Sequence, residues 1–404
     1  MTPRTFAFPT GFHALHPDRG MNFQMNRFWH WAGEARMLDE LRESSPRIRS
    51  YDDWTRELLA LGDRALSEGR ALAAAYYARA AEFFMAPDDP RRKPARARFL
   101  ELVAREYAVP ASARHAVPYE GRTLPAYRFT PRDARGRIVA FGGFDGYIEE
   151  RFPMLRALEA EGLDVVAFEG PGQGSVLEEG LPMTLEWGRP VRAVLDHFRL
   201  DDVTLVGFSL GGCLVMHGAA GEPRVRRVVA NDVLTDFVEV AARQVNPAAG
   251  RFMRWANIVP APVLNLGVTL ARRRNRVVDW GIRQGMRVFG ARSPAEYLRR
   301  MRAFRTAEVS ARVTQDVLLM AGVADHFVPF RQLGDQLLTL TNARSVTAHA
   351  FTGPSDAKHH CGIGDLGSVI RVIVEWLDAT GGRAARASGA GFHGTSEVAV
   401  ARGR

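Results

Sequence analysis

Six short apolar runs alternate with helical stretches from the middle of the chain onward, and this alternation restricts the fold more than any other feature. Each run is rich in β-branched residues and is bounded by Gly, Asp or Pro, which is typical of buried strands in a parallel sheet. The repeated strand–helix units build a doubly wound sheet. The sequence therefore predicts an α/β fold with a mostly parallel sheet, whose strands we place at residues 138–141, 165–168, 203–206, 228–230, 317–320 and 346–351.

The segments before and between these strands differ in the spacing of their apolar residues. Residues 21–105 show helical spacing of apolar side chains, and residues 114–119 and 123–130 predict a β-hairpin that turns at Glu120-Gly121. Residues 234–315 are helical and far longer than one crossover requires, so they predict a cap inserted over the carboxyl edge of the sheet. The chain thus divides into an N-terminal extension (1–20), a helical N-terminal domain (21–109), an α/β domain with its cap insertion (110–380) and a disordered tail (381–404).

The composition narrows the choice of partners. The net charge is +9, but only Lys93 and Lys358 are lysines, and the arginines are scattered through every segment without a nucleic-acid-binding module. We therefore expect a solvated basic surface and no nucleic-acid partner. The chain has no signal-peptide pattern and no run of 18 apolar residues, so we expect no membrane partner. Two cysteines make no disulfide framework, which favours a cytoplasmic location.

The sequence Gly207-Phe-Ser-Leu-Gly211 fits the G-x-S-x-G pattern of a nucleophile elbow. In that turn the serine lies at the apex between a strand and a helix, and the tight backbone leaves no room for side chains at the flanking positions. Here an apolar strand precedes the motif and a helical segment follows it, so we interpret Ser209 as a catalytic nucleophile. The alternative is a glycine-rich turn with a structural serine.

A serine hydroxyl needs a base and an orienting acid, which follow the elbow in the order acid, then histidine. Asp325 comes directly after the strand at 317–320, where an acid would emerge beside the elbow. His360 is the candidate base, and the adjacent His359 is the alternative. His326, beside the proposed acid, is interpreted as structural.

An oxyanion requires two N–H donors. The amide of Leu210, next to the nucleophile, is one, and the loop Gly142-Gly-Phe-Asp-Gly146 predicts the other at Phe144, with Asp145 as the alternative. The loop Gly170-Pro-Gly-Gln-Gly174 lacks the spacing of a phosphate-binding motif and indicates a tight turn below the site rim. We expect no cofactor and no metal site.

With these residues in place, the chain resembles the α/β-hydrolase superfamily. Within it, the chain resembles the group of 2,6-dihydroxypseudooxynicotine hydrolase and the fungal hydrolases that shorten naphthopyrone pigments. The resemblance is carried by five pieces of sequence, at residues 142–150, 169–174, 207–212, 324–325 and 359–361.

The resemblance implies the α/β-hydrolase fold, a serine triad, a helical N-terminal domain that shapes the pocket, and a homodimer. Some members of the group hydrolyse a carbon–carbon bond next to a ketone, and several place an extra acid near the site. Asp232 is a candidate for that acid. We expect Asp145, Tyr147 and Asp232 to contact a small-molecule substrate.

The sequence therefore predicts a serine hydrolase for a hydrophobic carbonyl compound, with an ester or a ketone C–C bond as the target. A carboxylesterase or an acyl-peptide hydrolase is the alternative enzyme. A non-hydrolytic member that binds a ligand or guides a cyclisation is a third hypothesis, which the intact set of Ser209, Asp325 and His360 disfavours.

Overall fold

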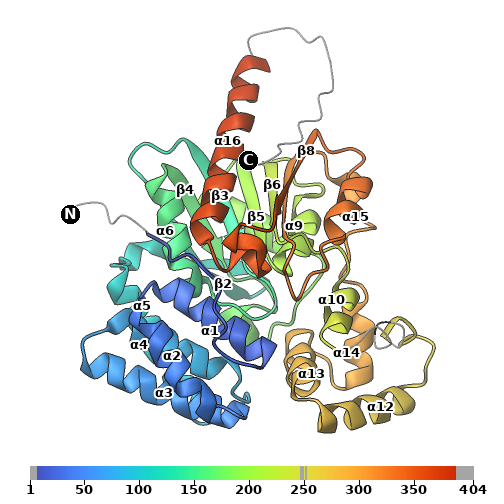
Figure 1. Cartoon of the computed structure of the whole chain (residues 1–404). Coiled ribbons are helices and arrows are strands. Elements are labelled where there is room, and N and C mark those ends of the chain that lie inside the picture. The colour runs from blue at the N-terminus through green and yellow to red at the C-terminus, as the bar shows by residue number, and fades with distance from the viewer. Residues whose placement is uncertain (1–6, 246–249, 251–252, 388–404) are drawn as a thin grey trace.

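The computed structural model describes residues 7–245, 250 and 253–387, and its centre is an eight-stranded sheet (Figure 1). The strand order is β1-β2-β4-β3-β5-β6-β7-β8. The last six strands in this order, β4 and β3 included, run parallel to one another. This arrangement confirms the predicted α/β fold and the predicted positions of its six parallel strands. The strands are β1 (Arg114–Tyr119), β2 (Arg122–Phe129), β3 (Gly136–Phe141), β4 (Leu163–Phe168), β5 (Val203–Phe208), β6 (Val225–Asn231), β7 (Asp316–Gly322) and β8 (Ser345–Phe351).

The first two strands form the predicted hairpin. Tyr119 pairs with Arg122 across a two-residue turn in which both Glu120 and Gly121 have positive φ, 48° and 75°. Such a turn matches the right-handed twist of the two strands and favours glycine at its second position. The hairpin joins the edge of the parallel sheet because β2 pairs antiparallel with β4.

Helices cover both faces of the sheet, and each face has its own apolar core. One core joins α6 (Phe152–Ala160) and α16 (Leu366–Ala387) to the N-terminal helices. The other joins α8 (Gly188–Phe198), α9 (Gly211–Ala219), α15 (Gln332–Thr339) and the helices of the insertion. A short helix, α7 (Gly174–Glu178), follows β4. Of the described helices, none is both long and apolar enough to cross a bilayer.

The N-terminal region is a set of helices at the lower end of the molecule in Figure 1, and its apolar side chains share one core with those of α6 and α16. Ser50 caps the third of them by accepting a hydrogen bond from the amide of Asp53, and the Ala-rich fourth helix is buried along almost its whole length. These helices are α1 (Arg19–Ala32), α2 (Arg36–Ser44), α3 (Tyr51–Ser67), α4 (Ala71–Phe83) and α5 (Arg92–Glu106).

The insertion after β6 is helical and lies beside the N-terminal helices at the same end of the molecule (Figure 1). The apolar composition of residues 255–289 predicts that this part of the insertion lines a closed cavity. The structure corrects this for α12, because Val263, Leu266 and Leu270 are exposed to solvent. The described helices of the insertion are α10 (Phe237–Arg243), α12 (Ala261–Arg274), α13 (Arg276–Val288) and α14 (Pro294–Met301).

The C-terminal helix also corrects a sequence boundary. We expected disorder from residue 381, but α16 continues to Ala387, because the apolar spacing of its first turns anchors it on the sheet. The remainder of the predicted tail, residues 388–404, lies outside the described residues.

A buried carboxylate joins the N-terminal helices to the loop after β3. Glu150 accepts hydrogen bonds from Arg27 Nη2 at 2.5 Å, Arg79 Nε at 2.7 Å and the amide of Tyr147 at 3.0 Å. Burial alone would raise the pKa of Glu150, but the charges of Arg27 and Arg79 outweigh burial and lower that pKa to about 2. The carboxylate is therefore ionised whenever the protein is folded near neutral pH.

We expect Glu150→Gln to lower the free energy of unfolding by about 3 kcal/mol at pH 7, because two buried arginines lose their shared anion. The native pKa lies below the unfolded value, so this stabilisation is full above about pH 4.5 and is lost as the pH falls toward 2. Urea unfolding across that range measures both effects. The matched control is Glu101→Gln on the exposed face of α5; equal stability of the two variants at pH 7 would contradict the prediction.

Candidate active site

The turn between β5 and α9 holds Ser209 in a strained backbone conformation. Its φ is 59°, in the left-handed region that side chains other than glycine rarely adopt. A Cβ at Gly207 would lie 2.0 Å from the carbonyl oxygen of Gly211, and one at Gly211 would lie 2.6 Å from that of Gly142. The two glycines of the motif are therefore required by close backbone contacts, and the turn presents Ser209 to a cavity above the sheet.

A continuous chain of hydrogen bonds leads away from the serine. The Oγ of Ser209 lies 2.9 Å from Nε2 of His360, and Nδ1 of His360 lies 2.7 Å from Oδ2 of Asp325. The other carboxylate oxygen of Asp325 accepts hydrogen bonds from the amides of Phe327 and Val328. The structure thus brings together the three residues that the sequence singled out from the ends of three different strands.

The two remaining histidine candidates are placed differently. His359 stacks on Phe12, with ring centroids 3.7 Å apart. His326 is buried between Phe23 and Phe327, and burial lowers its pKa to about 3. Of the three, only His360 contacts Ser209 in the described part of the chain.

Asp232 provides a second carboxylate at the same histidine. Its Oδ2 lies 3.0 Å from Nδ1 of His360 and accepts a hydrogen bond from the amide of Cys361 at 2.6 Å. The residue is buried behind the histidine and does not line the cavity. The expected substrate contact of Asp232 is therefore corrected, because its position at the end of β6 points it at His360 instead.

The pKa values of the two carboxyl groups, Asp232 and Asp325, shift in opposite directions. Burial and then the negative charge of Asp325 raise the pKa of Asp232 to about 7. Burial acts in the same direction on Asp325, but the charge of His360 outweighs it and holds the pKa of Asp325 well below its usual range. Near neutral pH a proton is therefore held by Asp232 or by the imidazole of His360. The negative charge of Asp325 raises the pKa of His360, although burial acts in the opposite direction.

We expect Asp232→Asn to shift the acid limb of the kcat/KM profile to lower pH. The substitution removes a negative charge from Nδ1, which destabilises the imidazolium and lowers the apparent pKa for loss of the last proton. Rates measured between pH 5 and 9 on an activated ester test this. Asp236→Asn is a control, since Asp236 caps α10 and does not contact His360; an unchanged limb in Asp232→Asn would contradict the prediction.

The loop after β3 runs directly past the amide that follows the nucleophile. A Cβ at Gly143 would lie 2.7 Å from the backbone nitrogen of Leu210. Gln173, from the glycine-rich loop after β4, holds this loop in place by donating from Nε2 to the carbonyl oxygen of Gly142 at 2.6 Å. That second loop is thus the expected tight turn, and its glutamine adds a positioning contact that the sequence did not indicate.

Three residues of the same loop, Phe144, Asp145 and Tyr147, differ in whether they line the cavity. Phe144 and Asp145 both line the cavity that contains Ser209. Tyr147 does not, because its hydroxyl lies 3.0 Å from Oε1 of Glu82 and its ring lies between Arg79 and Arg96. The predicted substrate contact of Tyr147 is therefore corrected to a contact with the N-terminal helices.

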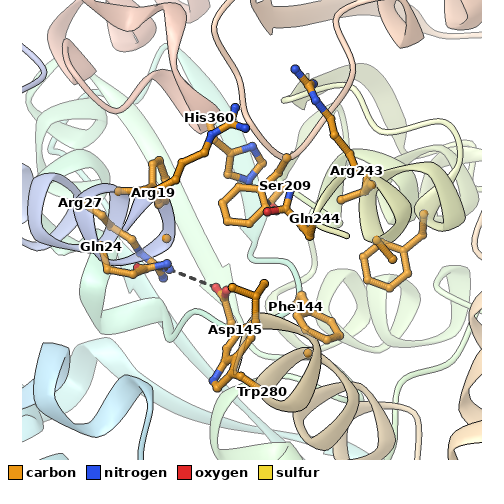
Figure 2. A pocket seen from close by; sticks show the side chains of 18 of the residues that line it. Arg19, Gln24, Arg27, Phe144, Asp145, Ser209, Arg243, Gln244, Trp280 and His360 are labelled. Atoms are coloured by element: carbon orange, nitrogen blue, oxygen red, sulfur yellow. Dashed lines mark hydrogen bonds and ion pairs between the residues drawn. The ribbon is translucent and has the colours of Figure 1, made fainter. Parts of the chain in front are cut away.

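The cavity above Ser209 has a volume of about 340 Å³ and two unlike sides (Figure 2). Aromatic and aliphatic side chains from the insertion and the β3 loop make the larger side; they include Phe144, Phe237, Trp280, Ile282, Tyr297 and Met301. Polar side chains from α1 and the end of α10 make the other; they are Arg19, Gln24, Arg27, Arg243 and Gln244. A cavity of this size and character suits a small, largely apolar ligand with a few polar groups.

Sequence reasoning missed every polar residue of that second side. Arg27 reaches Asp145 across 118 positions of the chain, at 3.1 Å. Its signal in the sequence is only an arginine in an amphipathic helix, which is also typical of a solvated surface.

One group of described residues could bring three metal-ligating atoms together, namely Asp232, His360 and Cys361. All three are already engaged. The ring of His360 contacts Ser209 on one side and two carboxylates on the other, and the thiol of Cys361 faces the carbonyl oxygen of Asn231. The donor set therefore does not fit a metal without dismantling the hydrogen-bond chain.

Comparisons with known proteins place the chain in a family and identify structures with a similar fold. A model of the alpha/beta hydrolase family matches residues 140–364. The chain is 28% identical over 367 residues to "Hydrolyase poxO" from Penicillium oxalicum. The aligned region covers 79% of this chain and 85% of that relative. The chain is also 28% identical over 356 residues to "20-hydroxy-prefusarin hydrolase FUS2" from Gibberella moniliformis, covering 80% and 83%. The crystal structure of 2,6-dihydroxy-pseudo-oxynicotine hydrolase shares the fold, with a TM-score of 0.61, 20% identity, and coverage of 87% and 94%.

Proposed function

The chain belongs to the alpha/beta hydrolase family and is a hydrolase, and we propose that it cleaves an ester or ketone C–C bond of a hydrophobic carbonyl compound through a covalent acyl-enzyme. Ser209 is the nucleophile, His360 the base and Asp325 the orienting acid of this proposal. The observation that carries it is the unbroken hydrogen-bond chain among these residues at the wall of a largely apolar cavity.

In the proposed first step, Ser209 Oγ attacks the carbonyl carbon while His360 Nε2 takes the hydroxyl proton. The new oxyanion would accept hydrogen bonds from the amides of Leu210 and Phe144. The close approach of Gly143 to the Leu210 nitrogen supports that assignment, since it brings the loop and the elbow amide to one point. Asp325 holds the ring of His360 and stabilises the imidazolium.

The leaving group departs with the proton from His360, and the acyl-enzyme forms. An alkoxide leaving group needs only that proton, whereas a carbanion must also be delocalised. Water then attacks the acyl carbon while His360 takes its proton, and the acid product leaves with the hydroxyl of water. His360 returns that proton to Oγ of Ser209, which restores the free enzyme. One triad and one oxyanion hole would serve both bond types.

The decisive experiment combines labelling with a substrate panel. A fluorophosphonate should add to Ser209 of the purified chain, as seen by mass, and the panel should contain aryl esters, aminoacyl amides and β-diketones. Turnover of esters or diketones with products of the expected mass supports the proposal. Rapid aminoacyl-amide turnover alone favours an acyl-peptide hydrolase, and absence of labelling favours the non-hydrolytic alternative.

The bond type can be tested through one acid at the cavity wall. Asp145 lines the cavity and is held by Arg27, so its carboxylate could orient a carbon leaving group while His360 supplies the proton. Selective loss of β-diketone cleavage in Asp145→Asn, with aryl-ester turnover retained, would support C–C chemistry. The homodimer and the cytoplasmic location stay predictions.

A further inference from the structure

The cavity that contains Ser209 carries more positive than negative charge. Four arginines line it, but only two aspartates, Asp18 and Asp145. Arg27 is paired with Asp145 and with Glu150. The other three arginines have no carboxylate oxygen within 4.0 Å among the residues that the structure describes; they are Arg19, Arg151 and Arg243.

Arg243 is held in place without being neutralised. It ends α10, and its Nη1 donates a hydrogen bond to the carbonyl oxygen of Val328 at 2.9 Å. The neighbouring Gln244 donates to the carbonyl oxygen of His326 at 2.7 Å, which fixes the same turn. A carbonyl satisfies one N–H of the guanidinium but leaves its charge and its remaining donors available.

Arg19 approaches the same cavity from the N-terminal helices, in an unfavourable setting. It is the first residue of α1, where the partial positive charge of the helix end disfavours a cation. Burial and then the like charge of Arg243 lower the pKa of Arg19. Two cations from distant parts of the chain therefore face one cavity beside Ser209 (Figure 2). The charge of Asp325 acts favourably on Arg19, but no described carboxylate pairs directly with either arginine.

We propose that Arg19 and Arg243 together bind a carboxylate group of the substrate, an inference that rests on the proposed hydrolase function. Guanidinium groups match the planar geometry of a carboxylate and form strong, charge-assisted hydrogen bonds with it. The apolar side of the cavity, with Phe144 and Trp280, then takes the hydrophobic body of the molecule. The substrate is thus an amphipathic carbonyl acid rather than a neutral ester or ketone.

Two matched probes separate this inference from the proposed function. One is an alkyl fluorophosphonate whose chain ends in a carboxylate, and the other carries the methyl ester of that carboxylate. Both need a nucleophilic Ser209, but only the first carries the charge. We expect the carboxylate probe to label the chain at least about tenfold faster, and the ratio to fall as ionic strength rises.

The variants are Arg19→Gln, Arg243→Gln and the double substitution, with Arg132→Gln in the exposed β2–β3 loop as the matched control. Each single change should reduce the preference several-fold and the double change should abolish it, while labelling by the neutral probe stays constant. Arg19→Lys should recover part of the preference.

The outcomes distinguish the two ideas. Equal labelling by both probes, or a preference that survives the double substitution, would overturn carboxylate binding and leave the hydrolase proposal standing. Failure of both probes to label Ser209 would overturn the proposed function and this inference with it. Loss of labelling by both probes in a variant that retains its thermal transition would assign the arginines to the reaction itself, and so would also overturn the proposal.

Discussion

Ser209→Ala is expected to lower kcat by at least about 10⁴-fold and to leave the fold unchanged. The substitution removes only Oγ, whose one hydrogen bond to the described residues is with Nε2 of His360. The backbone bond from the amide of Ser209 to the carbonyl oxygen of Asn231 remains, and alanine adds no atom to the tight turn. Without Oγ no acyl-enzyme can form.

Activity, fluorophosphonate labelling and the thermal transition should be measured on the same preparation. Ser67→Ala is the control, because Ser67 is exposed at the end of α3 and does not line the cavity. Loss of the thermal transition together with activity would assign a structural role to Ser209, and turnover that persists in the folded variant would exclude it as the nucleophile.

The fold could be predicted from the sequence because its determinants are local. A buried parallel strand is apolar along its whole length, and β4, β5 and β7 are buried at every position. The family resemblance, drawn from five short pieces, is confirmed by the family match over residues 140–364. Ser209, Asp325 and His360 could be singled out because each follows a strand whose carboxyl end reaches one edge of the sheet.

The contacts that could not be predicted depend on where a side chain points and on packing between segments far apart in the chain. The sequence places Asp232 at the end of β6 but does not say whether its carboxylate faces the cavity or His360. Tyr147 lies in the motif-bearing loop, yet its hydroxyl turns to Glu82 on α4. Part of the polar side of the cavity comes from α1, more than a hundred positions before the elbow, so no local pattern links Arg19 or Arg27 to Ser209.

The same limit applies to the insertion. The helix α12 of the insertion is apolar enough to suggest a cavity wall, but Leu266 is 62% exposed. The following helix, α13, supplies Trp280 and Ile282 to the cavity instead. Hydrophobicity alone does not indicate which of two adjacent amphipathic helices turns its apolar face inward, because that depends on their packing against α14.

The two adjacent histidines give a second large expected effect. His360→Ala should lower kcat by about 10³-fold or more, because it removes the base that takes the proton of Ser209 and leaves Asp325 without its partner. His359→Ala should cost only a few-fold, because its ring stacks on Phe12 and does not reach the serine. Both residues lie in one short loop, so each variant controls for disturbance of that loop by the other.

The comparison is sharpest when labelling and turnover are measured together. Loss of a base slows attack on a fluorophosphonate as well as on a substrate, so His360→Ala should lower both rates in parallel while its thermal transition stays close to that of His359→Ala. A structural defect would instead reduce the fraction of protein that can be labelled without changing the rate of the remainder. The reverse order of effects would move the base to His359. The 2.9 Å contact from His360 to Ser209 and the 2.7 Å contact from His360 to Asp325 argue against that order. His359 could replace neither contact without rotating the loop and breaking the hydrogen bond that the amide of Cys361 donates to Asp232.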